Sequence, residues 1–348
     1  MITNSNLSDS QWTQASLPVY AGGLGIRRVT SLAPSAFLAS AACTHDLQAQ
    51  ILTSSTIPDD TALMAARLSW SSAHNQPFPT LPAALKQAAW DKPSIAADTA
   101  KVLADAKNPI DLARLLACSA PHSGDWLHAL PISSCGLRLE DEAIRIAVGL
   151  RLGSNLCQPH TCPCGAQVDS RGIHGLSCRK SSGRLARHHN INDLIYRALS
   201  KAGVPSTKEP VGLLRSDGKR PDGLTMIPWQ CGKSLTWDVT VADTFAASHL
   251  PSTSLAAAGA AVSAASKKEA KYASLAQSHI FIPIACETMG PFNPAAANFF
   301  KELGKRMSAA SGDSRETAFL FQRISIAIQR FNCVCFQGSF IPSPDLEG

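Results

Sequence analysis

The chain has 348 residues, of which 45% are hydrophobic and 17% are charged, and this composition is typical of a folded globular protein rather than a disordered one. The formal net charge is a modest +6. The polar start of the chain, residues 1–14, is unlike a signal peptide, and the Ala-rich run 255–265 is too short to span a bilayer, so we expect an intracellular protein without a membrane segment.

The first 150 residues predict a helical region. A short extended piece around Gly22–Ile26 is followed by a helix that begins near residues 31–34. Proline and Asn-Pro breaks separate the further predicted helices, which are 62–73, 81–89, 95–106, 110–117 and 139–152. Acidic residues stand in the first turn of the last of these helices and arginines follow, as the helix dipole favours. No residues in this region suggest chemistry.

A cluster of cysteine and histidine residues follows directly. Cys162, Cys164, His174 and Cys178 are spaced C-x-C-x(9)-H-x(3)-C, and four such ligands can close a tetrahedron around structural zinc. Eleven cysteines, an odd number, in a chain with no predicted secretory signal favour reduced thiols over disulfides. The competing interpretation is a loop with unpaired thiols and a surface histidine.

Two further residues, Cys157 and His160, lie near enough in the sequence to replace one of these four ligands. Gly165, Gly172 and Gly175 are expected to supply the permissive backbone that such a compact turn requires.

The remainder of the chain alternates between helices and strands, which predicts an α/β fold built on a mixed sheet. The predicted order is helix, three strands, helix, strand and two helices. The corresponding segments are 189–202 closed by Gly203, 209–214, 223–229, 234–242, 255–277, 279–287, 295–310 and 317–331.

Two aspartates in these strands suggest a second metal site. Asp222 lies in Arg-Pro-Asp-Gly at the start of one predicted strand, and Asp238 lies within the next. If the strands pair, the two carboxylates converge and can bind Mg²⁺ or Mn²⁺, which assists phosphodiester hydrolysis. The alternative is that Pro-Asp-Gly is an ordinary turn and both acids are solvated. Asp243 and Glu209 are weaker candidates for the same metal.

A cation is expected beside these acids to offset phosphate charge. The position two residues after Asp238 is Thr240, so the amine has to come from elsewhere. The predicted helix that follows carries Lys267, Lys268 and Lys271, of which Lys268 and Lys271 share one face. We rank Lys271 before Lys268, against the alternative that these lysines face water.

Basic residues are concentrated between positions 171 and 220, and a local excess of this kind favours a polyanionic partner. A solvated basic surface is the alternative. The proposed nucleic-acid contacts are Arg179, Lys180, Arg184, Arg187, His188 and Arg220.

The second half of the chain resembles the C-terminal part of site-specific non-LTR retrotransposon proteins. There a Cys-Cys-His-Cys knuckle is followed by an Arg-His segment, here Arg187-His188-His189-Asn190, and by a restriction-like endonuclease of the PD-(D/E)XK superfamily. The resemblance implies metal-binding roles for Asp222 and Asp238. It also implies catalytic help from Lys268, Lys271 and Tyr272.

The N-terminal segment, Leu17-Pro18 with Gly22–Ile26, looks like the end of a non-LTR reverse transcriptase. The resemblance therefore implies five segments: 1–45 as a polymerase remnant, 46–150 as a helical thumb or linker, 151–185 as the zinc knuckle, 186–338 as the endonuclease and 339–348 as a tail. Pro58-Asp59-Asp60 lacks the aromatic residue of a polymerase motif, so no polymerase activity is expected.

The expected function is therefore a Mg²⁺- or Mn²⁺-dependent DNA endonuclease in the nucleus, with structural zinc and with DNA, or element RNA, as its partner. The alternative is a catalytically inactive zinc-containing module that binds nucleic acid and comes from a decayed element.

Overall fold

The computed structural model describes residues 2–52, 60–213 and 218–341. The chain forms two compact units, Ser8–Asp105 and Ala106–Gly348 together with Met1–Leu7. Pro58, Asp59, Arg215 and part of the predicted tail lie outside the described residues. None of the described helices is long and apolar enough to cross a membrane.

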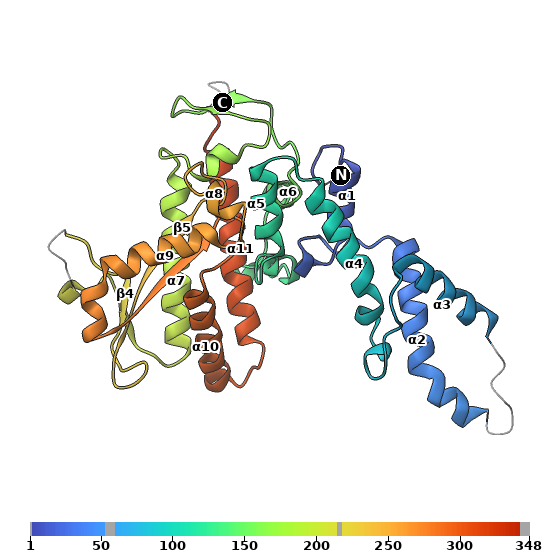
Figure 1. Cartoon of the computed structure of the whole chain (residues 1–348). Helices are drawn as coiled ribbons and strands as arrows, with labels where there is room; N and C mark the ends of the chain where they lie inside the picture. The colour runs from blue at the N-terminus through green and yellow to red at the C-terminus, as the bar shows by residue number, and fades with distance from the viewer. Residues whose placement is uncertain (1, 53–59, 214–217, 342–348) are drawn as a thin grey trace. The chain divides into compact units, whose positions relative to one another are not determined.

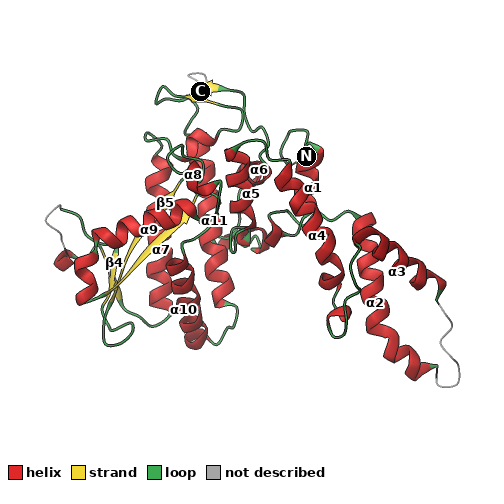
Figure 2. Ribbon diagram, in the orientation of Figure 1, coloured by secondary structure: helices red, strands yellow, loops and turns green. Residues whose placement is uncertain are grey.

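The unit Ser8–Asp105 is entirely helical in its described part (Figures 1 and 2). Its core contains Leu38, Trp70 and Trp90, and both indole N–H groups donate to backbone carbonyls. Its helices are α1 (Asp9–Ser16), η1 (Val19–Ala21), α2 (Val29–Ile51), α3 (Thr61–His74), η2 (Ala83–Leu85) and α4 (Gln87–Ala104).

Two expectations for this unit need correction. The chain around Gly22 forms a short 3-10 turn and a left-handed glycine rather than a strand, and α2 begins at Val29. The predicted helices 81–89 and 95–106 are replaced by η2 and by one helix, α4, which continues through Pro93. Trp90 and Val102, on either side of Pro93, are buried, and this packing offsets the backbone hydrogen bond that proline removes.

The second unit begins with helices that the sequence predicted. They are α5 (Pro109–Ser119) and α6 (Asp141–Leu152), the latter with Asp141 and Glu142 in its first turn. The 3-10 helices η3 (Asp125–His128) and η4 (Ser133–Cys135) connect them. A small antiparallel hairpin of β1 (His160–Thr161) and β2 (Gln167–Val168) follows, and then η5 (Ile173–Leu176).

The α/β part of this unit contains a mixed four-stranded sheet, as the sequence predicted. The strands lie in the order β3 (Ser206–Lys208), β4 (Gly223–Thr225), β5 (Leu235–Ala242) and β6 (Ile280–Glu287). The pairs β3/β4 and β4/β5 are antiparallel, and β5/β6 is parallel.

The two faces of this sheet are covered by different helices (Figure 1). Side chains of Trp237 and Val239 on β5 enter the main hydrophobic core with residues of α7 (Ser182–Lys201), α10 (Pro294–Ser311) and α11 (Glu316–Gln337). The helix α9 (Gly259–Lys271) packs against β5 and β6 through Ala261 and Ala265. Since side chains alternate along a strand, Asp238 points away from the face of Trp237 and Val239.

Two predicted segments differ from the structure. Instead of a strand over 209–214, β3 ends at Lys208, Glu209 has a left-handed backbone with φ of 47°, and η6 (Val211–Leu213) follows. Instead of one helix over 255–277, the chain forms α8 (Leu250–Thr253), α9 and η7 (Ala273–Gln277). A left-handed residue, Ala258 with φ of 64°, separates α8 from α9.

Candidate functional site

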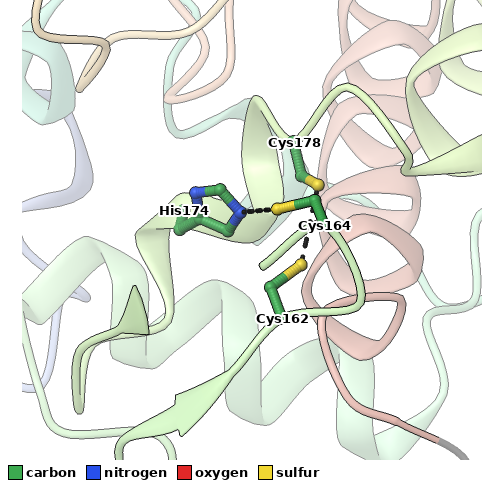
Figure 3. Close-up of side chains that lie close together, drawn as sticks. All are labelled: Cys162, Cys164, His174 and Cys178. Carbon is green, nitrogen blue, oxygen red and sulfur yellow. Dashed lines mark hydrogen bonds between the residues drawn. The ribbon is translucent and has the colours of Figure 1, made fainter. Parts of the chain in front are cut away.

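The four predicted zinc ligands converge on one point (Figure 3). Cys162 and Cys164 lie in the turn between β1 and β2, His174 lies in η5, and Cys178 lies between η5 and α7. The left-handed backbone of Gly165, with φ of 91°, turns the chain after Cys164.

The ligand atoms fit a tetrahedral metal ion. They all lie within 4.8 Å of one another, and the Sγ atoms of Cys162 and Cys178 are 3.6 Å apart. Zn–S bonds of about 2.3 Å place two thiolates of a tetrahedron about 3.8 Å apart. The Sγ of Cys164 is 3.2 Å from Nε2 of His174. Three thiols and one imidazole are therefore a donor set, with suitable spacing, that can hold zinc.

The two alternative ligands lie elsewhere. Nε2 of His160 is 3.1 Å from the hydroxyl of Ser339, and its ring stacks on Phe340. The thiol of Cys157 faces the backbone oxygens of Asp169 and Ser170. The structure thus selects the four residues of the predicted spacing and excludes Cys157 and His160 from the cluster.

The protonation of the cluster favours metal binding at one of its thiols. A hydrogen bond from the backbone N–H of Ala166 lowers the pKa of Cys164 to about 6, and the neighbouring ligands add to this effect. Burial raises the pKa of the Cys162 thiol to about 11. Because thiolate is the form that binds metal, Cys164 is prepared for it, whereas Cys162 needs the charge of a bound cation.

The segment that carries these ligands packs closely on the C-terminal part of α11. A Cβ atom added at Gly172 would lie 2.1 Å from the Phe336 ring, and one at Gly175 would lie 2.7 Å from the Cys335 carbonyl oxygen. Gly172 also has a left-handed backbone, as expected, with φ of 68°. Gly175 does not, so its requirement for glycine comes from close packing rather than from backbone freedom.

Asp222 lies against the backbone of β5 next to Asp238. Gly223 pairs with Trp237, and the backbone N–H of Asp222 donates to the carbonyl of Trp237. The Oδ2 of Asp222 accepts a hydrogen bond of 2.6 Å from the backbone N–H of Val239, the residue after Asp238. Both carboxylates lie within electrostatic range of the same histidine, His188.

Lys268 is the amine that reaches Asp238. Its Nζ lies 2.5 Å from Oδ1 of Asp238, whose side chain is 5% exposed. Lys271, which we ranked first, instead donates to the hydroxyl of Tyr272, and that hydroxyl donates to the carbonyl of Arg220. Of the two lysines, Lys268 is thus the one whose pairing with Asp238 the structure shows. The buried Tyr272 connects α9 to the segment before Asp222 and does not contact either aspartate through these bonds.

His188 has a different position from the one its sequence context suggested. We expected it to contact nucleic acid, but Nε2 of His188 lies 3.1 Å from Oδ2 of Asp222. This hydrogen bond, with the charges of Asp222 and Asp238, raises the pKa of His188 above its usual value against the opposing effect of burial. The sequence signal for His188 was its place in the Arg-His segment, and sequence reasoning missed its contact with Asp222.

Asn192 is a second residue that sequence reasoning missed. Its Oδ1 accepts from Nε1 of Trp237 at 2.8 Å, and its Nδ2 donates to the backbone carbonyl of Asp222 at 3.4 Å. It lies on α7 one turn after His188, so the two side chains share a face of the helix. Gly223 allows the Trp237 ring to pack here, because an added Cβ would lie 2.0 Å from that ring.

The predicted basic contacts are only partly available to a ligand. Arg179, Lys180 and Arg184 are exposed. Arg220 is half-buried and pairs with Glu209.

Arg187, in contrast, is 1% exposed, and its guanidinium donates to Asn332 and to the carbonyl of Leu176. We therefore remove Arg187 from the proposed contacts.

The two weaker carboxylates have other partners. Asp243 is buried beside Thr288, and burial raises its pKa. Glu209 contributes its backbone N–H to the Asp222 carbonyl, whereas its carboxylate binds Arg220. Neither of these contacts directs a carboxylate to Asp238.

The sequence was compared with known proteins as well. No family model matches the chain, and no curated protein matches it. The molecule is a mixed α/β protein with a Cys₃His cluster that can hold a metal ion and with a separate Asp-Asp-His-Lys cluster.

Proposed function

We propose that the chain is a divalent-metal-dependent DNA endonuclease, of the restriction-like type present in non-LTR retrotransposon proteins, and that zinc at the Cys₃His cluster has a structural role. The observation that supports the proposal is that Asp222 hydrogen bonds to the β5 backbone next to Asp238, and that the Asp238 carboxylate pairs with Lys268 of α9. Two carboxylates with a nearby ammonium group match the requirements of metal-assisted phosphodiester hydrolysis.

Asp222 and Asp238 would hold Mg²⁺ or Mn²⁺, which supplies charge stabilisation and lowers the pKa of a bound water. Lys268 would keep its ammonium beside Asp238 and face the charge that develops on the phosphate. In the net reaction, a water oxygen bonds to phosphorus, the bond from phosphorus to the leaving oxygen breaks, the water proton passes to solvent, and the leaving oxygen takes a proton from solvent.

The remaining residues of the site would position this machinery. Asn192 holds both the backbone of Asp222 and the ring of Trp237. The exposed Arg179 and Lys180 lie in the segment that joins the Cys₃His cluster to α7, and the exposed Arg184 lies in the first turn of α7. Contacts of these side chains with phosphates would hold a nucleic-acid backbone without reading its sequence.

The test is cleavage of plasmid DNA by the full chain with Mg²⁺ or Mn²⁺. We expect nicking by the wild type and none by Asp222→Asn or Asp238→Asn. Asp313→Asn is the matched control, because Asp313 lies in the turn before α11 and pairs with Arg315. Equal cleavage by all four proteins would exclude the assignment, and salt-sensitive DNA binding without cleavage would support an inactive binding module instead.

A further inference from the structure

A cavity of about 390 Å³ lies beside the Asp222 backbone, and the side chains of Asp222, Asp238 and Lys268 are not among its lining residues. It is open to solvent and is lined by residues of α7, of β3 with the residue after it, and of α11. Two of its residues, Asn192 and Glu209, hydrogen bond to the backbone carbonyl of Asp222. The volume falls in the range of about 300–1,000 Å³ that is typical of small-molecule sites.

Two side chains in this cavity have groups that remain available to a ligand. Within the described part of the chain, the amide of Asn190 makes no hydrogen bond and the ring of Phe331 makes no aromatic contact. Both side chains are half-buried, so the surrounding residues restrict their motion while part of each side chain remains accessible. His189 adds an imidazole at the rim, where its ring meets that of His188 edge-on with centroids 5.4 Å apart.

The charged side chains around the cavity are already paired with one another. Nζ of Lys208 is 2.6 Å from Oδ1 of Asp193, Asp193 also pairs with Arg197, and Glu209 pairs with Arg220. Lys208, the lysine of the lining, is thus engaged by a carboxylate, and a flat neutral group with hydrogen-bonding edges fits the amide of Asn190 and the ring of Phe331.

We propose that this cavity holds one unstacked nucleobase with an exocyclic amine (adenine, cytosine or guanine) from a nucleic-acid strand whose backbone crosses the Asp222 site. The face of the base would stack on Phe331, and the amide of Asn190 would hydrogen bond to its edge. The amide oxygen of Asn190 would accept a hydrogen bond from an exocyclic amine, which thymine and uracil lack. The inference rests on the proposed function in one respect, namely that the nucleic-acid backbone passes the Asp222 site.

The test measures, by fluorescence anisotropy, how tightly the full chain binds fluorescein-labelled single strands. The strands are about 12 nucleotides long, within the span of about 4–16 nucleotides that single-stranded sites cover. The affinities for poly-dA, poly-dC and poly-dT are compared, and no Mg²⁺ or Mn²⁺ is added so that the strands stay intact. We expect poly-dA or poly-dC to bind about tenfold more tightly than poly-dT, as one good base contact provides.

Variants then locate the site. Phe331→Leu is expected to weaken binding of the preferred strand about tenfold through lost stacking, and Phe331→Tyr is expected to restore it. Asn190→Ala should reduce the preference over poly-dT about fivefold or more. Phe37→Leu, an exposed aromatic on α2, is the matched control and should have no effect.

Equal affinities for the three strands, or no change in Phe331→Leu and Asn190→Ala, would overturn the base site. The outcomes separate the two proposals. Plasmid cleavage with no base preference removes this inference and leaves the nuclease standing. Base preference that depends on Phe331 and Asn190, in a protein that cleaves nothing, removes the nuclease and leaves the base site standing.

Discussion

The ion pair between Lys268 and Asp238 gives the strongest test of the second cluster, because it depends on the fold alone. The side chain of Asp238 is 5% exposed and that of Lys268 is 25% exposed. Replacement of Lys268 by methionine keeps the apolar stem and removes the ammonium, which leaves a buried carboxylate without its partner. Loss of one partner of a fully buried pair costs about 3–5 kcal/mol. Since the ammonium is partly solvated, we expect about 2–3 kcal/mol.

The measurement is a double-mutant cycle in urea unfolding with Lys268→Met, Asp238→Asn and the double variant. In the Asp238→Asn background the carboxylate that Lys268 pairs with is already absent, so Lys268→Met should cost less than about 1 kcal/mol. Lys267→Met on the same helix is the control, because Lys267 is exposed, and it should stay within about 0.5 kcal/mol of the wild type. An equal cost of Lys268→Met in both backgrounds would refute the pairing and remove Lys268 from the candidate site.

Three further predictions concern other parts of the structure. Gly223→Ala should destabilise the protein by about 1–3 kcal/mol in the same unfolding assay, because the new Cβ would lie 2.0 Å from the Trp237 ring. Burial raises the pKa of Glu287 above its usual value of 4.5. The stability that its protonated form contributes is therefore full below pH 4.5 and is lost as the pH rises through the folded pKa. The free energy of unfolding of the wild type, relative to that of Glu287→Gln, should fall as the pH rises from 4.5 through the folded pKa. Cys162→Ser, or treatment with a chelator, should release zinc, measured by atomic emission, and lower the melting temperature.

Controls and contrary results for these three are specific. Gly212→Ala adds a Cβ with nothing within 4 Å and should leave stability unchanged. Cys157→Ser should retain zinc, because that thiol lies outside the cluster. A wild-type protein that contains no zinc after expression with zinc, or a Glu287→Gln difference that is the same at pH 5 and pH 8, would contradict the corresponding prediction.

Much of the fold could be predicted because its signals are local. The apolar runs of β5 and β6 and the helices α3, α5 and α6 lie within about a residue or two of the predicted positions. The errors fall where one backbone angle decides the outcome. Ala258 in a left-handed conformation interrupts a segment whose composition is typical of one long helix, and nothing in an alanine indicates such an angle.

The sequence by itself determined that a Cys/His metal-ligand cluster lies in one short segment, because spacing there nearly dictates proximity, and the structure then excluded Cys157 and His160 from it. Only the tertiary structure decided the second cluster, since His188, Asp222 and Lys268 are dozens of residues apart and meet through packing of α7 and α9 against opposite faces of one sheet. The same long-range packing placed Lys268 beside Asp238 and buried Arg187 against α11, and no spacing rule along the chain contains that information.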